Sequence, residues 1–247
     1  MARYAMVIDL TKCVGCQACT AACNKEWDVP LGFARTRVHP TGVMGTFPNL
    51  SSGFRIAQCN QCDRPGCVAA CPTGATRQSE DGIVHIDRGL CIGCGYCVDA
   101  CPYDARYISP VLNQADKCDF CSARLERGLE PACVATCTAH AKYFGDLEDS
   151  RSDVFRLVYE QGAKRLESRE VAIGPNVFYA GRDRDLEPVL ASFAPHPPRP
   201  VPSREFWARV LRPLVIAGVG ATFLGQAVAF FYQLAIGEPE EKHGEKS

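Results

Sequence analysis

The stretch CIGCGYCVDACP, residues 91–102, contains four cysteines at the spacing C-x2-C-x2-C-x3-C, followed by proline. In bacterial ferredoxins, three cysteines of such a run hold one [4Fe–4S] cluster and the fourth binds a neighbouring cluster. A fourth cysteine that serves another cluster needs partner cysteines elsewhere in the chain. The rest of the sequence should therefore contain the ligands of at least one further cluster.

All 16 cysteines of the 247-residue chain fall into four groups of four. Each group begins with C-x2-C and ends with C-x3-C, and only the middle gap varies, at two, four, two and eleven residues. Cluster irons need soft thiolate ligands, so the pattern predicts four [4Fe–4S] clusters. The groups are Cys13, Cys16, Cys19 and Cys23; Cys59, Cys62, Cys67 and Cys71; Cys91, Cys94, Cys97 and Cys101; and Cys118, Cys121, Cys133 and Cys137.

Three other uses of cysteine fit the pattern less well. Four all-cysteine zinc sites would also consume sixteen thiols, but zinc rarely needs the C-x3-C-P ending. Disulfide frameworks belong mostly to small secreted domains, whereas this chain is long and opens without a recognisable signal peptide or twin-arginine pair. Covalent haem requires C-x-x-C-H, and no such run occurs.

The remaining composition argues against several function classes. The net charge is −1 and no basic block occurs, so no nucleic-acid partner is expected. The sequence also lacks a Gly-rich nucleotide loop and a nucleophile–base signature. We therefore expect a non-catalytic chain whose clusters carry electrons.

An internal repeat links the first and third cysteine groups. The segment IDLTKCVGCQACTAAC (8–23) aligns without gaps to IDRGLCIGCGYCVDAC (86–101), with eight of sixteen positions identical. CVAACPTGA (67–75) likewise resembles CVATCTAHA (133–141). The chain thus alternates two motif types, and each two-cluster unit should combine one of each type. The residues alone leave two pairings open, namely consecutive groups, or the middle two groups enclosed by the outer two.

The order of the four groups resembles the iron–sulfur subunit of molybdopterin oxidoreductases of the dimethyl-sulfoxide-reductase family. The similarity covers nearly the whole chain, including EPACVATC (130–137) and the tail FWARVLRPLVIAGVGATFLGQ (206–226). Within that family, the tail looks most like the beta subunit of respiratory formate dehydrogenase N. The resemblance implies an α+β fold of two nested ferredoxin-like units with insertions, followed by one C-terminal transmembrane helix.

The resemblance also implies a nested pairing of ligands, in which the last cysteine of each group serves a cluster of another group. Thr138 stands where a ferredoxin has proline, a departure that leaves ligation intact. The four implied ligand sets are Cys13, Cys16, Cys19 and Cys137; Cys118, Cys121, Cys133 and Cys23; Cys59, Cys62, Cys67 and Cys101; and Cys91, Cys94, Cys97 and Cys71.

Other segments predict conventional elements. The apolar runs YAMVID (4–9) and GIVHID (82–87) read as strands that precede cysteine groups, and NVFYA (176–180) reads as another strand. Residues 152–167 predict an amphipathic helix with Ser152 or Asp153 as its N-cap.

Residues 24–58, rich in glycine and proline, read as a long insertion that covers the clusters or docks a partner, with Trp27 and Phe33 as anchors. Lys12 and Lys117 each precede the first cysteine of a group. They could raise a cluster potential, although such lysines more often face solvent.

The end of the chain predicts a membrane anchor. Residues 214–237 carry no charge, and about 24 residues at roughly 1.5 Å each can cross a hydrocarbon core of about 30 Å. A buried core helix is the alternative, but the segment follows the proline-rich linker 194–202 and ends the chain. Small residues recur every four positions, at Ala217, Ala221, Gly225 and Ala229, and favour close packing against another membrane helix.

These predictions define four parts of the chain. Residues 1–150 form the four-cluster domain and 151–203 a helix, a strand and a proline-rich linker. Residues 204–237 form the anchor helix, and 238–247 a polar tail.

The sequence and the resemblance together predict an electron-transfer subunit. It would connect a molybdopterin catalytic subunit, with molybdenum or tungsten, to a membrane cytochrome b subunit that reacts with quinone. Alternatives are the electron-transfer subunit of a membrane-bound hydrogenase, the corresponding subunit of a thiosulfate, polysulfide or tetrathionate reductase, and a stand-alone polyferredoxin.

Two arguments about the side of the membrane disagree. Four arginines precede the helix and two lysines follow it, which favours a cytoplasmic cluster domain. The resemblance favours the periplasmic face, because a folded cluster domain exported with a partner need not follow a rule for short loops. We expect the periplasmic face.

Overall fold

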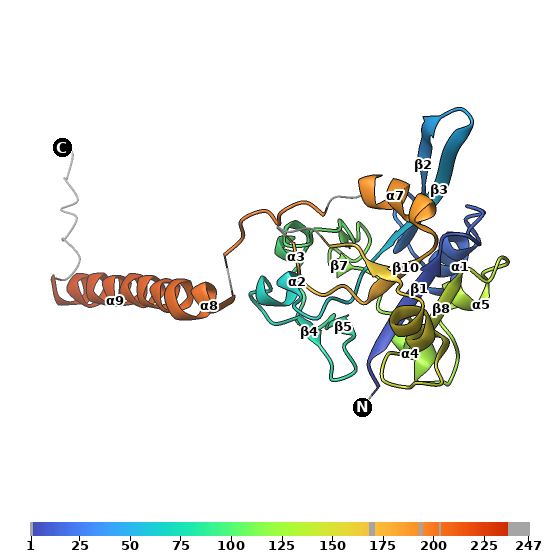
Figure 1. The fold of residues 1–247 in the computed structure, drawn as a ribbon. Coiled ribbons are helices and arrows are strands. Elements are labelled where there is room, and N and C mark those ends of the chain that lie inside the picture. The colour runs from blue at the N-terminus through green and yellow to red at the C-terminus, as the bar shows by residue number, and fades with distance from the viewer. Residues whose placement is uncertain (1, 168–170, 193–194, 203, 237–247) are drawn as a thin grey trace, which may run out of the picture. The chain divides into compact units, whose positions relative to one another are not determined.

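The structure is a computed structural model, and the residues it describes are 2–167, 171–192, 195–202 and 204–236 (Figure 1). The chain divides into two compact units, Met1–Pro202 and Ser203–Ser247. The first unit combines short helices with small sheets, and the second contains a long apolar helix. The predicted α+β class is confirmed.

A four-stranded sheet with the order β8–β1–β10–β9 lies in the first unit. β1 pairs antiparallel with β8, where Met6 lies opposite Phe144, and parallel with β10, where Met6 lies opposite Val177. The first strand of the chain therefore has both its partners near the other end of the unit. The strands are β1 (Tyr4–Asp9), β8 (Lys142–Asp146), β9 (Lys164–Arg165) and β10 (Val177–Ala180).

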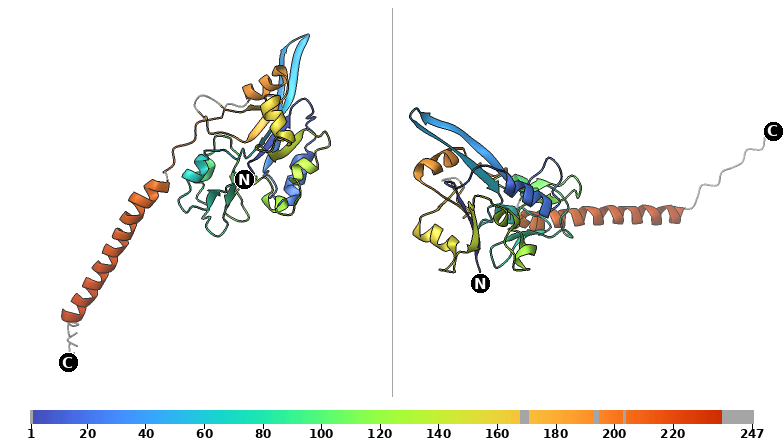
Figure 2. Two further views of the ribbon diagram at one scale, coloured as in Figure 1. Left: turned by 60° about the horizontal axis from the view of Figure 1, so that its bottom comes forward. Right: turned by 90° about the vertical axis from the view of Figure 1, so that its right-hand side faces the viewer.

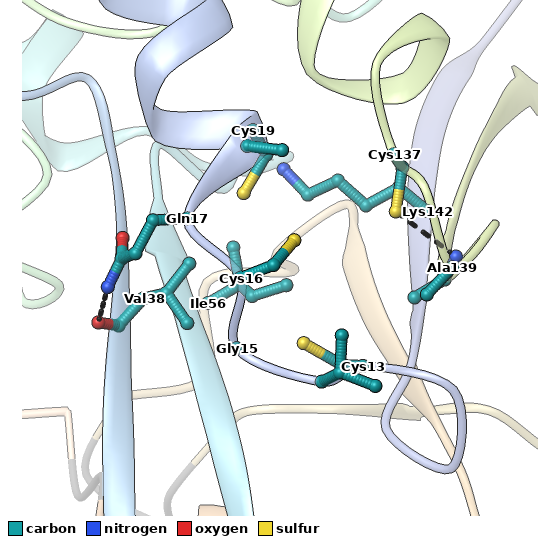
Figure 3. A pocket seen from close by; sticks show the side chains of 13 residues that line it. Cys13, Gly15, Cys16, Gln17, Cys19, Val38, Ile56, Cys137, Ala139 and Lys142 are labelled. Atoms are coloured by element: carbon teal, nitrogen blue, oxygen red, sulfur yellow. Dashed lines mark hydrogen bonds between the residues drawn. The ribbon is translucent and has the colours of Figure 1, made fainter.

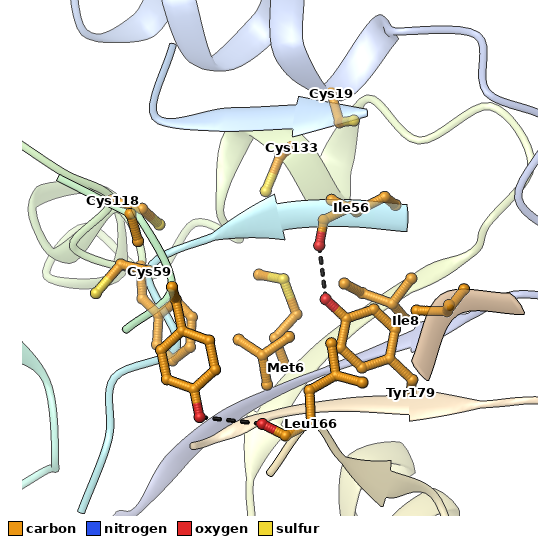
Figure 4. Packing of buried hydrophobic residues seen from close by; sticks show 14 of the residues in the cluster. Met6, Ile8, Cys19, Ile56, Cys59, Cys118, Cys133, Leu166 and Tyr179 are labelled. Carbon is orange, nitrogen blue, oxygen red and sulfur yellow. Dashed lines mark hydrogen bonds between the residues drawn. The ribbon is translucent and has the colours of Figure 1, made fainter. Parts of the chain in front are cut away.

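Both faces of β1 are buried, which explains why its sequence is a continuous apolar run rather than an alternating one. Met6 and Ile8 belong to the larger core cluster with Ile56 and Tyr179 (Figure 4). The Tyr179 hydroxyl donates to the Ile56 carbonyl at 2.6 Å, so this buried phenol is satisfied. The opposite face packs Ala5 and Val7 against Leu147, Val154 and Phe178.

The insertion at 24–58 forms a long hairpin that extends beyond the rest of the first unit (Figures 1 and 2). Its strands are β2 (Thr36–Thr46) and β3 (Asn49–Gln58), and α7 (Asp183–Ser192) packs beside them. The sequence did not predict these strands or α7. Two shorter hairpins join β4 (Thr76–Gln78) to β5 (Val84–Ile86) and β6 (Tyr107–Ile108) to β7 (Ala115–Asp116).

A short helix carries the third cysteine of each group, and α1 also carries the fourth cysteine of the first group. α1 contacts α5, and α2 contacts α3 (Figure 1). The first and fourth groups therefore meet, as do the second and third. The helices are α1 (Ala18–Glu26), α2 (Gly66–Ala69), α3 (Tyr96–Asp99), α4 (Ser122–Leu125) and α5 (Ala132–Ala135).

The helix predicted over 152–167 is shorter than expected. It comprises α6 (Asp153–Phe155) and the π-helical turn η1 (Arg156–Glu160), and Ser152 caps it by accepting from the Val154 amide at 3.1 Å. The predicted cap is confirmed. The helix ends early because Gly162 takes a left-handed conformation, at φ +70°.

The second unit is helical from Arg204 to Ile236. α8 (Arg204–Phe206), the π-helical turn η2 (Trp207–Leu211) and α9 (Arg212–Ile236) follow one another. Pro213 lacks the amide that would bond the Arg209 carbonyl, which accounts for the wider turn at η2. Arg204–Tyr232 is long and apolar enough to cross a membrane, and its apolar side chains are exposed. The last residue of the predicted anchor and the predicted polar tail lie outside the described residues.

A buried ion-pair network connects the hairpin β2–β3 to β7. Arg35 donates to both carboxylate oxygens of Asp116, at 2.9 and 2.8 Å, and both side chains are buried. Arg88 and the Tyr107 hydroxyl donate to the same carboxylate, at 2.7 and 2.5 Å. These contacts hold the pKa of Asp116 below its ordinary value despite its burial, mainly through Arg35.

Replacing Asp116 by alanine should lower the free energy of unfolding by about 3–5 kcal/mol, because the buried Arg35 loses its two-bonded carboxylate and keeps only Asp119, at 3.7 Å. Urea unfolding of the iron-loaded protein, followed by tryptophan fluorescence, measures the change. The matched control is Asp183→Ala, which removes a surface pair with Lys164 and should cost much less. Equal losses in the two variants would contradict the assigned role of the network.

Candidate iron–sulfur sites

The four cysteine groups share one backbone feature. The residue directly before the second cysteine has a left-handed conformation in every group, at Gly15 (φ 69°), Gln61 (φ 47°), Gly93 (φ 69°) and Phe120 (φ 54°). This conformation turns the chain sharply between the first two thiols. The two quite different side chains, Gln61 and Phe120, are both fully buried, and their packing offsets the local strain.

At Gly15 and Gly93 a side chain would also collide with its neighbours. A Cβ on Gly93 would lie 2.1 Å from the Asn113 carbonyl oxygen, and one on Gly15 would lie 2.3 Å from the Phe54 ring. Glycine relieves the strain of this conformation at both positions, and at Gly93 the close approach of the Asn113 backbone excludes any side chain.

The sequence repeat also has a structural counterpart. Asp9 and Asp87 occupy equivalent positions, and the side chain of each accepts from a backbone amide two residues on, at 2.9 Å. Their carbonyls accept from the amides of Cys13 and Cys91, at 3.2 and 3.1 Å. The same turn therefore presents the first cysteine of the first and third groups.

The first pocket brings together four of the predicted ligands. It is lined by Cys13, Cys16, Cys19 and Cys137, whose sulfurs point toward a common space (Figure 3). The Cys137 sulfur accepts from the Ala141 amide at 3.2 Å. The last cysteine of the fourth group thus lies with the first three of the first group.

A second pocket is lined by Cys23, Cys118, Cys121 and Cys133. Burial raises the pKa of Cys23 to about 12, and the adjacent Cys133 and Cys121 contribute. Trp27 also lines this pocket. Its indole N–H donates to the Cys121 sulfur at 3.3 Å, and its ring lies 4.6 Å from the Arg35 guanidinium.

The second and third groups meet in a similar way. Burial raises the pKa of Cys62 well above its ordinary value. The neighbouring thiols Cys59, Cys101 and Cys67 raise it further, by smaller amounts. Burial and Cys59 likewise raise the pKa of Cys101 to about 11. The last cysteine of the third group therefore lies beside the second group.

The converse contact involves Cys97 and Cys71. Burial raises the pKa of Cys97, while Arg106 lowers it, and both Cys67 and Cys71 act on it as neighbouring thiols. Cys91 and Cys94 belong to the same loop as Cys97. The Cys71 sulfur accepts from the Thr76 amide at 3.4 Å.

Electrostatic effects between neighbouring thiols order the four predicted ligand sets in a row. Burial has the largest effect on the pKa of Cys19, and Cys133 raises this pKa further. Burial also raises the pKa of Cys118, with smaller contributions from Cys23, Cys133 and Cys59. Figure 4 shows Cys19 near Cys133 and Cys118 near Cys59. The Cys67–Cys97 contact links the last two sets. Cys16 in the first set and Cys94 in the last are exposed.

The donor set suits iron–sulfur cubes. Across the described parts of the chain, no three Cys, His, Asp or Glu side chains gather closely enough to hold a single metal ion. Thiolates around a cube bind separate irons and so stand farther apart. N–H groups from Ala141, Thr76 and Trp27 donate to sulfur at three of the sets, as expected for thiolates that stay charged.

Trp27 and the two cations Arg106 and Lys142 also reach these sulfurs, and the sequence did not assign them this role. Trp27 was predicted only as an anchor of the insertion. Arg106 and Lys142 were not singled out, although both are buried beside the cysteines. Burial alone would lower the pKa of Lys142, but Cys133, Cys19 and Cys118 raise it above its ordinary value.

The two lysines that precede cysteine groups differ in environment. Lys12 is exposed, and its ammonium donates to the Tyr143 hydroxyl and lies 3.5 Å from the Asp9 carboxylate. Lys117 is buried and donates to the carbonyls of Val84 and Cys118. The common solvent-facing role therefore applies to Lys12 but not to Lys117. Phe33, the other predicted anchor, stacks on Tyr107.

Comparison with known proteins identifies the type of domain. Residues 51–147 match the family described as a 4Fe-4S dicluster domain. Among similar proteins, the B component of tetrathionate reductase from Salmonella typhimurium is 45% identical over 183 residues, which cover 73% of each protein. The B component of polysulfide reductase from Wolinella succinogenes is 44% identical over 161 residues, covering 63% of this protein and 83% of the relative. Protein NrfC of Escherichia coli is 42% identical over 165 residues, covering 66% and 74%.

These matches, together with the sixteen grouped cysteines, confirm the prediction of four [4Fe–4S] clusters and of a non-catalytic electron-transfer chain. They do not specifically support the closer resemblance to the beta subunit of formate dehydrogenase N, because the names of these relatives include two reductases of sulfur compounds. This chain therefore belongs to the iron–sulfur electron-transfer subunits of the dimethyl-sulfoxide-reductase family.

Proposed function

We propose that this chain relays electrons between a membrane subunit that reacts with quinone and a molybdopterin catalytic subunit that reduces an inorganic sulfur compound. The observation that carries the proposal is the row of four thiol sets, with an exposed cysteine in the first set and another in the last. The names of the relatives supply the substrate class, since they include tetrathionate and polysulfide reductases.

The clusters supply one-electron sites, and the residues of the chain determine how these sites are held. Buried thiols such as Cys118 and Cys62 keep the middle of the row away from water. Exposed Cys16 and Cys94 leave the two end sites accessible to redox partners. Hydrogen bonds to sulfur, such as the one from Trp27, stabilise the charged thiolates.

We also propose the nested ligand sets, in which the first and fourth cysteine groups form one ferredoxin-like unit and the second and third groups, between them in the sequence, form the other. Cys137 completes the set of Cys13, Cys16 and Cys19, and Cys23 that of Cys118, Cys121 and Cys133. In the inner unit, Cys101 completes Cys59, Cys62 and Cys67, and Cys71 completes Cys91, Cys94 and Cys97. The two shared pockets and the thiol contacts between groups support these assignments.

The Cys23→Ser variant tests the nesting. In the nested arrangement it should alter the same electron paramagnetic resonance signal as Cys121→Ser, because both residues bind the second cluster. Cys62→Ser is the matched control and should alter a different signal. If Cys23→Ser instead changes the signal that Cys62→Ser changes, the consecutive arrangement is correct. Iron analysis of each variant shows how many clusters remain.

We propose that residues 204–237 anchor the chain in the membrane and that the cluster domain faces the periplasm. The length and apolar exposure of Arg204–Tyr232 support an anchor, because 29 helical residues exceed what a bilayer core requires. The side follows from the expectation that the folded cluster domain is exported with its catalytic partner. The charge difference across the helix, which points the other way, is small.

Protease treatment of intact spheroplasts tests both statements. We expect protease added outside to remove the cluster domain from the full-length chain, leaving the helix with the membrane. A chain truncated after residue 202 should be released in soluble form with its four clusters, because every cysteine precedes the cut. Protection of the cluster domain would place it in the cytoplasm. Loss of iron on truncation would show that the helix is needed for cluster binding.

A formate-dehydrogenase-like complex is the second candidate, and the similarity of the tail 206–226 favours it. In that case electrons would flow from the catalytic subunit toward quinone. The family membership alone fits either direction, because the same row of clusters conducts both ways.

Affinity purification from membranes distinguishes the candidates. We expect the full-length chain to copurify with a molybdopterin protein whose activity is reduction of tetrathionate, polysulfide or thiosulfate with a viologen donor. Formate oxidation in the same preparation would support the second candidate. A copurifying nickel–iron protein, or the chain alone with its clusters, would contradict both. Untagged membranes treated in the same way serve as the control.

A further inference from the structure

Arg106 and Lys142 are buried cations in direct reach of the predicted cluster ligands. Arg106 is 3% exposed and donates to the Cys67 sulfur at 3.0 Å and to the Thr76 hydroxyl at 3.3 Å. Lys142 is 4% exposed and donates to the Gln58 side-chain oxygen at 2.9 Å. Figure 3 shows the Lys142 ammonium beside Cys19.

Each cation lies between two neighbouring ligand sets. Lys142 interacts with Cys19 of the first set and with Cys133 and Cys118 of the second. Arg106 interacts with Cys67 of the third set and Cys97 of the fourth. Each of the two cluster pairs thus contains a buried cation within reach of thiols from both of its sets.

The two residues stand at the same distance from the last cysteine of a group. Arg106 follows Cys101 by five residues in CPYDAR (101–106), and Lys142 follows Cys137 by five in CTAHAK (137–142). In both segments alanine precedes the cation. The corresponding positions after the first and second groups hold Asp28 and Thr76, so only the third and fourth groups carry a cation at this point.

Neither charge is neutralised by a carboxylate. In the part of the chain that the structure describes, every ion pair involves residues other than Arg106 and Lys142. A buried cation without an anionic partner is strongly unfavourable. Arg35, which is also buried, has the carboxylates of Asp116 and Asp119 as partners. For Arg106 and Lys142, the thiolates and the clusters they hold are the available anions.

We propose that Arg106 and Lys142 are paired redox-tuning residues, each of which raises the reduction potentials of the two clusters that flank it. Adding one electron makes a cluster more negative by one charge, so a fixed nearby cation stabilises the reduced form more than the oxidised form. Burial keeps water and salt from screening the effect. Arg106 acts on the third and fourth clusters, and Lys142 on the first and second. The inference rests on the nested ligand sets proposed above.

The test is a redox titration of the purified full-length chain, followed by electron paramagnetic resonance. In Arg106→Gln, two of the four clusters should become harder to reduce. At a fixed solution potential, their oxidised-to-reduced ratio should rise about tenfold, which corresponds to about 59 mV for one electron. Lys142→Gln should shift the other two clusters. The signals altered by Cys121→Ser and Cys62→Ser identify which pair of clusters has changed its reduction potentials. Iron analysis verifies that four clusters are present.

Three further variants separate charge from structure. Arg106→Lys keeps the charge and should leave the potentials nearly unchanged. Lys12→Gln removes an exposed charge next to Cys13 and should have little effect. Gln58→Glu is isosteric and places a carboxylate beside the Lys142 ammonium. It should therefore lower the reduction potentials of the first and second clusters, and it provides this test even if Lys142→Gln fails to fold.

Unchanged potentials in Gln58→Glu, or in Arg106→Gln with all four clusters present, would overturn the proposal. An equal shift of all four clusters would also overturn it, because it would indicate a general disturbance. The Cys23→Ser experiment can fail to show nesting while each charge variant still shifts the reduction potentials of one pair of clusters. In that case the tuning role stands and the ligand sets need reassignment.

Discussion

The structure depends on thiols from separate parts of the chain meeting around common centres. A cube needs four ligands, and each C-x2-C loop with its following helix presents three of them on one side. In the proposed ligand sets the fourth comes from another group, and Cys137 lines the same pocket as Cys13, Cys16 and Cys19. This requirement explains why α1 contacts α5 and α2 contacts α3, and why the elements between them are short.

Burying anionic centres imposes an electrostatic constraint on the same region. Backbone amides, the Trp27 indole and two buried cations all direct positive ends toward sulfur. Arg35 shows the alternative arrangement, in which a buried cation pairs with carboxylates, chiefly Asp116, and links the hairpin β2–β3 to β7. The interior of this unit is therefore organised by charge as well as by apolar packing.

Much of this could be predicted from the sequence, because cysteine spacing and apolar runs are local signals. The strands at 4–9 and 176–180 and the Ser152 cap follow from such patterns. The β2–β3 hairpin was missed because its glycines and prolines break the alternation that marks a strand. The roles of Arg106 and Lys142 depend on neighbours distant in sequence, which no local spacing reveals. The predicted resemblance to the beta subunit of formate dehydrogenase N depended on the tail at 206–226. Many membrane-anchor helices share the apolar composition of this segment.

The position of β1 between β8 and β10 has a consequence for biosynthesis. The first strand leaves the ribosome long before its partners exist, since β10 ends at Ala180. At a synthesis rate of roughly 5–20 residues per second, β1 waits about ten to thirty seconds for its neighbours. During this interval its apolar run remains without a sheet, and the thiols of the first group remain without Cys137. The N-terminal segment is therefore completed only after residue 180 has been synthesised, and until then its apolar run and its thiols are exposed to aggregation and oxidation.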